Sequence, residues 1–143
     1  MKSSKKEHRV PLSNAAIKML KALPRVEGTD LVFTPQRGKN PLSDNTLTKL
    51  LGDMHDASVK RGGAGHIDPK QGKVITAHGF RSTFRDWASE ETHAARDVVE
   101  MALAHTIGNK VEAAYRRGDL FEKRRALMTE WATFCSPKSK VSG

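Results

Sequence analysis

The sequence predicts a mainly α-helical domain with a small β-hairpin or sheet near its N-terminus. Apolar residues recur at helical spacing in several separate segments, each followed by a polar or Gly- and Pro-containing connector. A short strand-like run, His8–Leu12, stands close to the start of the chain. The length of 143 residues fits one domain with a modest core, and no internal repeat is visible.

The first helix is expected directly after the strand of residues 8–12. Ser13 is the expected N-cap, because its hydroxyl can accept a hydrogen bond from a free amide of the first turn. Pro24 follows as a stop. The apolar face of this helix would consist of Ile17, Leu20 and Leu23. Residues 31–33 are expected as a strand or extended chain, and residues 36–41 as a loop.

The second helix is expected after Ser43, its predicted cap. It carries an apolar stripe at helical spacing that we expect to be buried: Leu47, Leu50, Leu51 and Met54. Residues 62–73 are glycine-rich and are expected to form a flexible connector. They resemble a phosphate-binding loop only superficially, because no strand precedes them and no Gly-Lys-Ser/Thr ends them.

Three more helical segments are expected in the second half. The first carries Phe80, Phe84, Trp87 and Ala88 at amphipathic spacing. Asp97 and Glu100 have the spacing of a capping box for a helix over residues 98–103. The last helix runs from Leu120 to Cys135, with Leu120, Leu127, Trp131 and Phe134 on one side. Residues 1–135 would form the domain, and residues 136–143 a disordered tail.

Composition narrows the class of protein. The 25 Lys and Arg residues outnumber 16 Asp and Glu residues, which gives a formal charge of +9 and favours a polyanionic partner such as nucleic acid. A solubilising surface or a ribosome-associated protein is the alternative. The single cysteine, Cys135, excludes an internal disulfide framework and fits a reducing cytoplasm. No apolar stretch is long enough for a membrane span, and the basic N-terminus is not a secretory signal.

Five side chains are candidates for phosphodiester chemistry: Lys2, His78, Arg81, His105 and Tyr115. An arginine fork matches two phosphate oxygens, a histidine moves protons near neutral pH, and a phenol flanked by cations can act as a nucleophile. Each has an ordinary alternative, such as a helix cap for His105 or a packed ring for Tyr115. No zinc-type Cys/His spacing and no Asp/Glu cluster for magnesium is present, so no metal or cofactor is expected.

Together these residues resemble a known pattern. The segments His78-Gly79-Phe80-Arg81, Leu103-Ala104-His105 and Ala114-Tyr115 are similar to the second conserved box of the tyrosine recombinase, or phage integrase, family. Lys2 with the following His8–Ser13 resembles the family's β-hairpin lysine and the strand after it. The segment 118–128 is typical of integrases of prophages and genomic islands. The resemblance covers nearly the whole chain and implies part of the tyrosine-recombinase catalytic fold, that of DNA breaking-rejoining enzymes.

The resemblance implies a role for each candidate residue. Tyr115 would attack the scissile phosphate and form a 3′-phosphotyrosyl link. Arg81 and His105 would bind phosphate oxygens. His78 would assist proton transfer, and Lys2 would protonate the 5′-oxygen leaving group. The implied partners are double-stranded attachment-site DNA, further integrase protomers in a tetrameric synapse and accessory DNA-bending proteins, in a cytoplasmic, nucleoid-associated setting without a membrane.

One departure from the family pattern concerns activity. The family's catalytic set includes a second arginine upstream of the lysine hairpin, and no residue of this sequence matches it. We therefore expect the C-terminal portion of an integrase catalytic domain, either an expression fragment or a natural truncation, that is weak or inactive alone. The alternatives are a non-catalytic remnant that binds DNA or docks on an integrase, and a generic basic helical protein.

Overall fold

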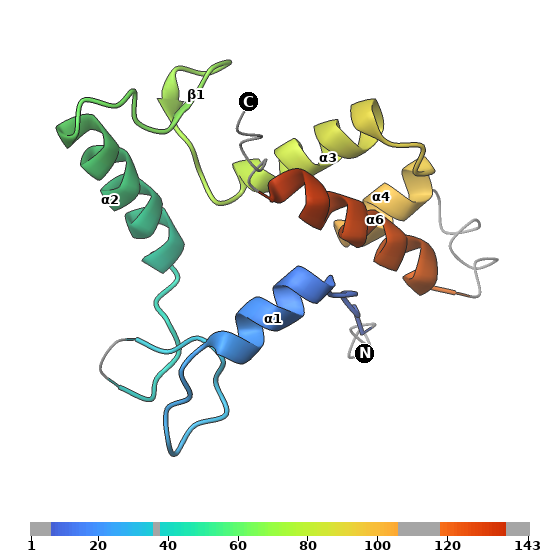
Figure 1. The fold of residues 1–143 in the computed structure, drawn as a ribbon, viewed down its shortest axis with the longest axis horizontal. Helices are drawn as coiled ribbons and strands as arrows, with labels where there is room; N and C mark the ends of the chain where they lie inside the picture. Colours follow the sequence, from blue (N-terminus) through green and yellow to red (C-terminus); the bar gives the residue numbers. More distant parts are fainter. Residues whose placement is uncertain (1–6, 36–37, 106–117, 137–143) are drawn as a thin grey trace, which may run out of the picture. The chain divides into compact units, whose positions relative to one another are not determined.

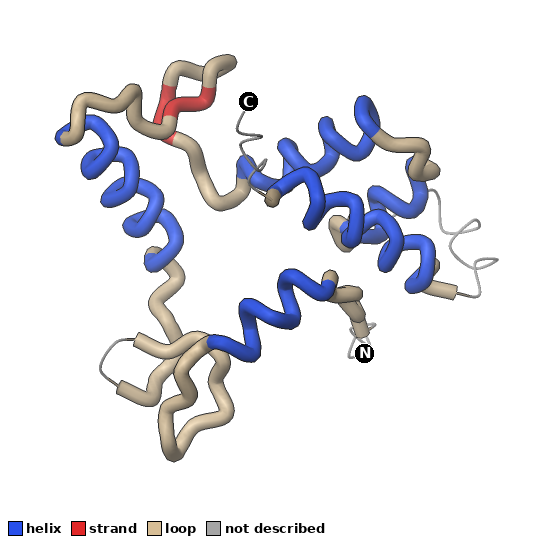
Figure 2. The backbone as a smooth tube through the Cα atoms, viewed as in Figure 1, coloured by secondary structure: helices blue, strands red, loops and turns tan. Residues whose placement is uncertain are grey.

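The computed structural model describes residues 7–35, 38–105 and 118–136, which are mainly helical (Figures 1 and 2). Two antiparallel strands form the one sheet of this part of the chain. The expected fold class, mainly α with a small sheet, is confirmed. In chain order the elements are α1 (Asn14–Ala22), α2 (Thr46–Lys60), β1 (Ile67–Asp68), β2 (Lys73–Val74), α3 (Gly79–Glu91), α4 (Arg96–Ala102) and α6 (Phe121–Cys135).

The chain divides into two compact units. One consists of the residues up to Ala22 together with those from Phe84 onward, and the other consists of Leu23–Thr83. The first unit contains the buried core, which α3, α4 and α6 share because each has one apolar face. Its fully or nearly buried apolar side chains are Phe84, Trp87, Ala88, Val98, Val99, Leu103 and Leu127.

An aromatic cluster joins α3 to α6 in this unit. The ring of Trp131 lies edge-on to Phe84, with centroids 5.2 Å apart, and 4.9 Å from the ring of Trp87. Phe134 stacks on Trp131 at 5.3 Å but stays 56% exposed, because it lies near the end of α6. The apolar spacing of both helices therefore predicted Phe84, Trp87, Ala88 and Leu127 correctly as core, whereas Phe80 is 52% exposed.

The start of α1 also agrees with the sequence. The hydroxyl of Ser13 accepts a hydrogen bond from the amide of Ala16 at 3.2 Å, so Ser13 caps the helix as predicted. The apolar face is less covered than its pattern implies. No residue of α1 is buried, and Ile17 is 36% exposed.

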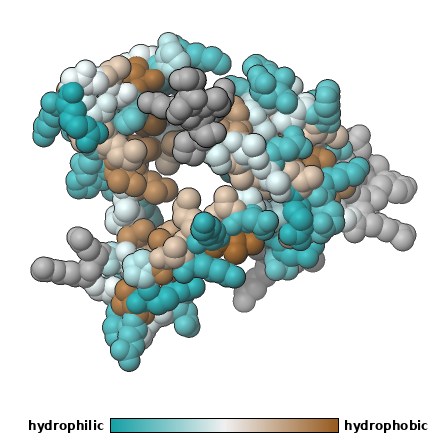
Figure 3. Space-filling view, in the orientation of Figure 1, coloured by the Kyte–Doolittle hydropathy of each residue, from teal (hydrophilic) through white to brown (hydrophobic). Residues whose placement is uncertain are grey.

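The predicted buried stripe of α2 is wrong. Leu47 is 57% and Leu50 50% exposed, and no residue of the helix is buried. Figure 3 shows apolar surface, coloured brown, over this part of the molecule. Within its unit α2 packs against the hairpin strand β2, which is too short to cover a helix of 15 residues. The helix also starts later than predicted. The hydroxyl of Ser43, the predicted cap, accepts from the amide of Asn45 in a turn ahead of the helix, and Asn45 is the N-cap residue.

The β-structure lies at a different place from the one expected. Ile67–Asp68 and Lys73–Val74 pair as a hairpin inside the segment expected to be a flexible connector. The carboxylate of Asp68 accepts from the amide of Lys70 at 2.8 Å, and Gly72 adopts a φ of +65° that favours glycine. The side chain and glycine together turn the chain back on itself.

The described residues 7–13 form no strand, in contrast to the prediction for residues 8–12. Pro11, which is buried, has no amide to donate to a ladder. The carbonyl of Arg9 is occupied by a side chain of α6 instead of a neighbouring strand. Residues 31–33 are likewise without a strand, and Phe33 is 59% exposed.

Candidate functional site

His78 and Arg81 stand at the start of α3, as the sequence predicted. The carbonyl of His78 accepts from the amide of Arg81 at 3.0 Å, so both belong to the first turn. Thr76 fixes this turn, because its hydroxyl accepts from the amide of Gly79 at 3.1 Å. His78 is exposed and Arg81 is half-buried. The sequence analysis missed Thr76, although a threonine three residues ahead of a helical amide is a common capping signal.

His105 follows the end of α4, where the main chain holds it. The amide of His105 donates to the carbonyl of Glu100 at 2.9 Å, and that of Ala104 donates to Met101 at 3.1 Å. This pair of bonds defines a Schellman motif, and Ala104 takes its left-handed position with a φ of 55°. Leu103 is buried in the core beside it. The motif fixes where the backbone of His105 lies.

The side chain of His105 is held by Glu100. Its Nδ1 atom lies 2.7 Å from Oε2 of Glu100, and the other carboxylate oxygen lies 2.9 Å from a guanidinium nitrogen of Arg85. The side chain of Glu100 is only 13% exposed. The hydrogen bond with His105, followed by the charge of Arg85, lowers the pKa of Glu100 although burial opposes them. The carboxylate is therefore ionised at neutral pH.

This contact corrects the predicted capping box of Asp97 and Glu100. Ala95 is the N-cap residue of α4, which puts Asp97 inside the first turn. Glu100 turns away from the helix start toward His105 and Arg85. Two charge-assisted contacts stabilise a carboxylate more than one bond to a backbone amide does. The spacing alone could not distinguish these arrangements, because both partners come from outside the capping motif.

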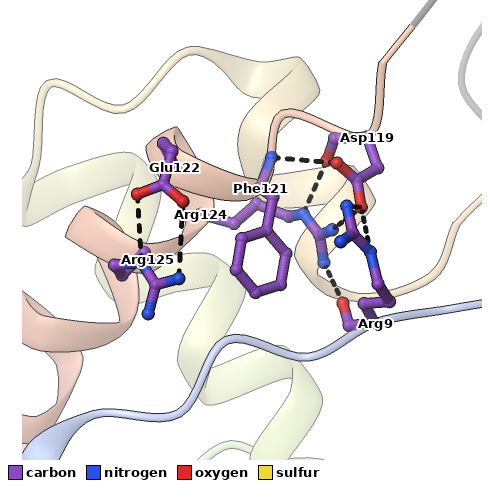
Figure 4. A network of polar contacts seen from close by, with 6 residues as sticks. All are labelled: Arg9, Asp119, Phe121, Glu122, Arg124 and Arg125. Atoms are coloured by element: carbon purple, nitrogen blue, oxygen red, sulfur yellow. Dashed lines mark hydrogen bonds and ion pairs between the residues drawn. The ribbon is translucent and has the colours of Figure 1, made fainter.

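A second polar network joins the N-terminal segment to the start of α6 (Figure 4). The guanidinium of Arg124, 1% exposed, donates to the carbonyl of Arg9 at 2.6 Å and to that of Asp119 at 2.8 Å. It also lies 3.1 Å from a carboxylate oxygen of Asp119. Arg9 pairs with the same oxygen at 2.7 Å. The buried charge of Arg124 is thus fully bonded.

Asp119 and Phe121 complete this network. The hydrogen bond from Arg9 lowers the pKa of Asp119, with the charges of Arg9 and Arg124 adding to the effect and burial opposing it. The ring of Phe121 lies 4.6 Å from the guanidinium carbon of Arg9 and 4.9 Å from that of Arg125. The sequence analysis missed this network, because Arg9 is more than 100 residues from its partners along the chain.

Lys2 and Tyr115 lie outside the described residues, as does the predicted tail beyond Ser136. The structure therefore places three of the five candidates, two at the start of α3 and one after α4. Among the described residues no group of three or more His, Cys, Asp or Glu side chains could hold a metal ion. None of the helices in this part of the chain is long and apolar enough to span a membrane.

The family model and the curated relatives that match this chain are all integrases. The phage integrase family matches residues 1–120. Prophage integrase IntA of Escherichia coli K12 is 34% identical over 129 residues, which are 89% of this chain and 27% of that protein. The integrase of Enterobacteria phage P4 is 30% identical over 131 residues, 91% of this chain and 27% of that protein.

A third relative, prophage integrase IntZ of Escherichia coli K12, is 26% identical over 130 residues, which are 90% of this chain and 28% of that protein. The chain thus spans 27–28% of the length of these relatives. No solved structure matches it.

Proposed function

The chain belongs to the phage integrase family, and from that premise we propose that it is part of a site-specific DNA recombinase with a tyrosine nucleophile. The observation that carries this proposal is the family match over residues 1–120, which includes Lys2, His78, Arg81, His105 and Tyr115. The backbone geometry of α3 and α4 supports it, because it fixes three of these residues at helix ends.

The proposed reaction is a transesterification. The phenol oxygen of Tyr115 attacks the scissile phosphorus and forms a 3′-phosphotyrosyl bond, while the bond from phosphorus to the 5′-oxygen breaks. The phenol loses its proton, with His78 assisting the transfer, and the leaving 5′-oxygen gains one from Lys2. Because one phosphoester bond replaces another, a second DNA end reverses the step without ATP.

In this proposal Arg81 and His105 bind the non-bridging oxygens of the scissile phosphate. Charge accumulates on the two non-bridging oxygens in the transition state, where a planar guanidinium and an imidazole donor stabilise it. Arg81 and Arg85 are four residues apart in α3 and share one helix face. The same face therefore carries a phosphate-binding candidate and the arginine that pairs with Glu100.

We further propose that these 143 residues alone cleave DNA weakly or not at all. The family pattern includes a second arginine that no residue here matches. Loss of one such donor costs about 3–4 kcal/mol of transition-state stabilisation, or roughly a hundred- to thousandfold in rate. The partners in this proposal are duplex attachment-site DNA, further integrase protomers and DNA-bending proteins, and the setting is the nucleoid.

A cleavage assay tests the proposal without a known attachment site. The full chain is incubated with a pool of randomised duplexes in which sulfur replaces the bridging 5′-oxygen. A thiolate is a far better leaving group than an alkoxide, so a slow enzyme still forms its adduct and the released thiol does not reverse it. We expect a protein–DNA adduct on a denaturing gel.

Two variants give the assay its controls. Tyr115→Phe should form no adduct, and the assignment is unambiguous because the chain contains one tyrosine. Lys2→Ala should keep its activity on the sulfur-containing DNA and lose it on ordinary DNA, because only the oxygen needs a proton to leave. An adduct that persists in Tyr115→Phe would contradict the proposal. Binding of DNA without any adduct would support the non-catalytic remnant.

A further inference from the structure

The geometry around α4 points to a role for Glu100, and we propose that it is the positioning residue of His105. Its carboxylate binds Nδ1 and holds the imidazole in one tautomer, so that His105 donates from Nε2 to a phosphate oxygen only as an imidazolium ion. The consequence for catalysis rests on the proposed recombinase function, whereas the tautomer does not.

The first step is the location of the proton between the two side chains. Nδ1 of His105 and Oε2 of Glu100 are 2.7 Å apart, the separation of a charge-assisted hydrogen bond. An ionised carboxylate has no proton to donate, so Nδ1 must carry one. The neutral ring is therefore held with a proton on Nδ1 and none on Nε2.

The second step concerns the free edge of the ring. With Nδ1 bound to Glu100, Nε2 is the nitrogen left for a ligand, and the His105 side chain is 40% exposed. In the neutral ring Nε2 has only a lone pair and cannot bond to a phosphodiester oxygen, which also only accepts. A second proton turns Nε2 into a donor and gives the ring a positive charge, which Glu100 balances.

The imidazole of His105 is held by the side chain of Glu100, whereas its main chain is held independently of that side chain. The charged groups that act on this carboxylate are Arg85 from α3, Arg96 from the first turn of α4 and His105 itself. The main-chain bond from the His105 amide ends on the backbone carbonyl of Glu100. A substitution of the Glu100 side chain therefore frees the ring while the Schellman motif is kept.

The tautomer can be measured directly. Long-range ¹H–¹⁵N spectra of the ¹⁵N-labelled full chain, recorded at about pH 8.5, distinguish protonated from bare ring nitrogens. A His105→Gln spectrum assigns the signal among the six histidines. We expect a protonated Nδ1 in the wild type and a shift toward protonated Nε2 in Glu100→Ala. A wild-type ring with the proton on Nε2 would overturn the proposal.

The consequence for catalysis has its own readout, the pH dependence of adduct formation on the sulfur-containing DNA. The wild type should lose rate as the pH rises, because only the doubly protonated ring donates from Nε2. In Glu100→Ala the neutral ring can carry its proton on Nε2, so the rate should depend less on pH. The variant should be slower by about tenfold at low pH, the effect of one charge-assisted hydrogen bond, and approach the wild type at high pH.

A matched control and the pattern of outcomes separate the two claims. Glu122→Gln removes an exposed carboxylate that pairs with Arg125, and it should leave the tautomer and the pH profile unchanged. Parallel profiles of wild type and Glu100→Ala at all pH values would overturn the catalytic role of Glu100. If the wild type forms no adduct at all but shows the proton on Nδ1, the recombinase proposal fails and the positioning of His105 by Glu100 stands.

Discussion

Glu100 also links the stability of the core unit to pH. Its pKa is lower in the folded chain than the ordinary value of 4.5, first because of the hydrogen bond with His105 and then because of Arg85. A lowered carboxylate pKa contributes stability above the unfolded pKa, and this contribution disappears as the pH falls through the folded value. The stability advantage of the wild type over Glu100→Gln should therefore be complete above the ordinary pKa of 4.5 and shrink as the pH falls below it.

Urea unfolding followed by tryptophan fluorescence measures this effect. Both tryptophans of the chain, Trp87 and Trp131, lie in the aromatic cluster of the same unit, so they report the stability of the part that contains Glu100. Arg85 keeps its charge throughout this pH range, so its ion pair is lost only when the carboxylate is protonated. A stability difference that stays constant on acidification would show that Glu100 gains nothing from its partners.

Arg124 offers a second test at the scale of one residue. Its guanidinium is buried and bonded to two carbonyls and a carboxylate. Arg124→Leu leaves these acceptors without their donor, and we expect a loss of about 2 kcal/mol in unfolding free energy. Arg125→Leu is the matched control on the next position, since its side chain is 50% exposed and its ion pair is worth under about 1 kcal/mol. Equal losses in the two variants would contradict the network.

At the scale of elements, the hairpin depends on a close approach at Gly65. The amide of His66 donates to Nδ1 of His55 in α2 at 2.9 Å, and a Cβ on Gly65 would overlap that ring. Gly62 has a similar positive φ of +80°, but open space surrounds it. Gly65→Ala and Gly62→Ala therefore share a backbone cost of about 1 kcal/mol, and only Gly65→Ala displaces His55.

Hydrogen exchange at the amide of His66 distinguishes the two variants. Gly65→Ala should expose this amide to solvent and raise its exchange rate by about tenfold or more, because its acceptor moves away. Gly62→Ala should leave the rate near that of the wild type. If both variants exchange alike, the packing of the hairpin on α2 does not depend on the His55 ring.

The elements also show what the sequence could predict. In α3 and α6 the central apolar positions meet another apolar face, so periodicity identified Phe84, Trp87 and Leu127 as core. Phe80 and Phe134, near the helix ends, stay 52% and 56% exposed. In α2 the same periodicity predicted a buried face that the small hairpin does not cover. Periodicity identifies which face of a helix is apolar, but it does not identify what packs against that face. The helices were therefore predictable, and the burial of α2 was not.

In the candidate site, too, some features could be predicted from the sequence and others could not. The resemblance to the integrase family made His78, Arg81 and His105 candidates, and the local pattern predicted that they lie at helix ends. The role of Glu100 was not, because Arg85 reaches it from a different helix and a capping box has the same spacing. Arg9 and Arg124 are separated by 115 residues, and no local pattern predicts their contact. The helix ends were predictable, and charge pairing between elements required the structure.

At the scale of the whole molecule, the excess of positive charge should govern binding to DNA. The formal charge of +9 predicts attraction to a phosphate backbone, and each phosphate neutralised by a cation releases counterions. The logarithm of the association constant then falls linearly with the logarithm of the salt concentration, with a slope of about −0.9 per phosphate. If the protein neutralises two phosphates, its affinity for DNA should fall roughly tenfold between about 50 mM and about 200 mM salt.

Fluorescence anisotropy with a labelled random-sequence duplex measures this slope, and we expect a loss of affinity of at least about tenfold over that range. An Arg81→Gln variant should bind with a slope smaller by about one phosphate, because its guanidinium is proposed to contact the backbone directly. Glu122→Gln should keep the slope, since it removes no cation. Affinity that does not change with salt would mean that the basic composition serves solubility, and the DNA-binding part of the proposal would fall with it.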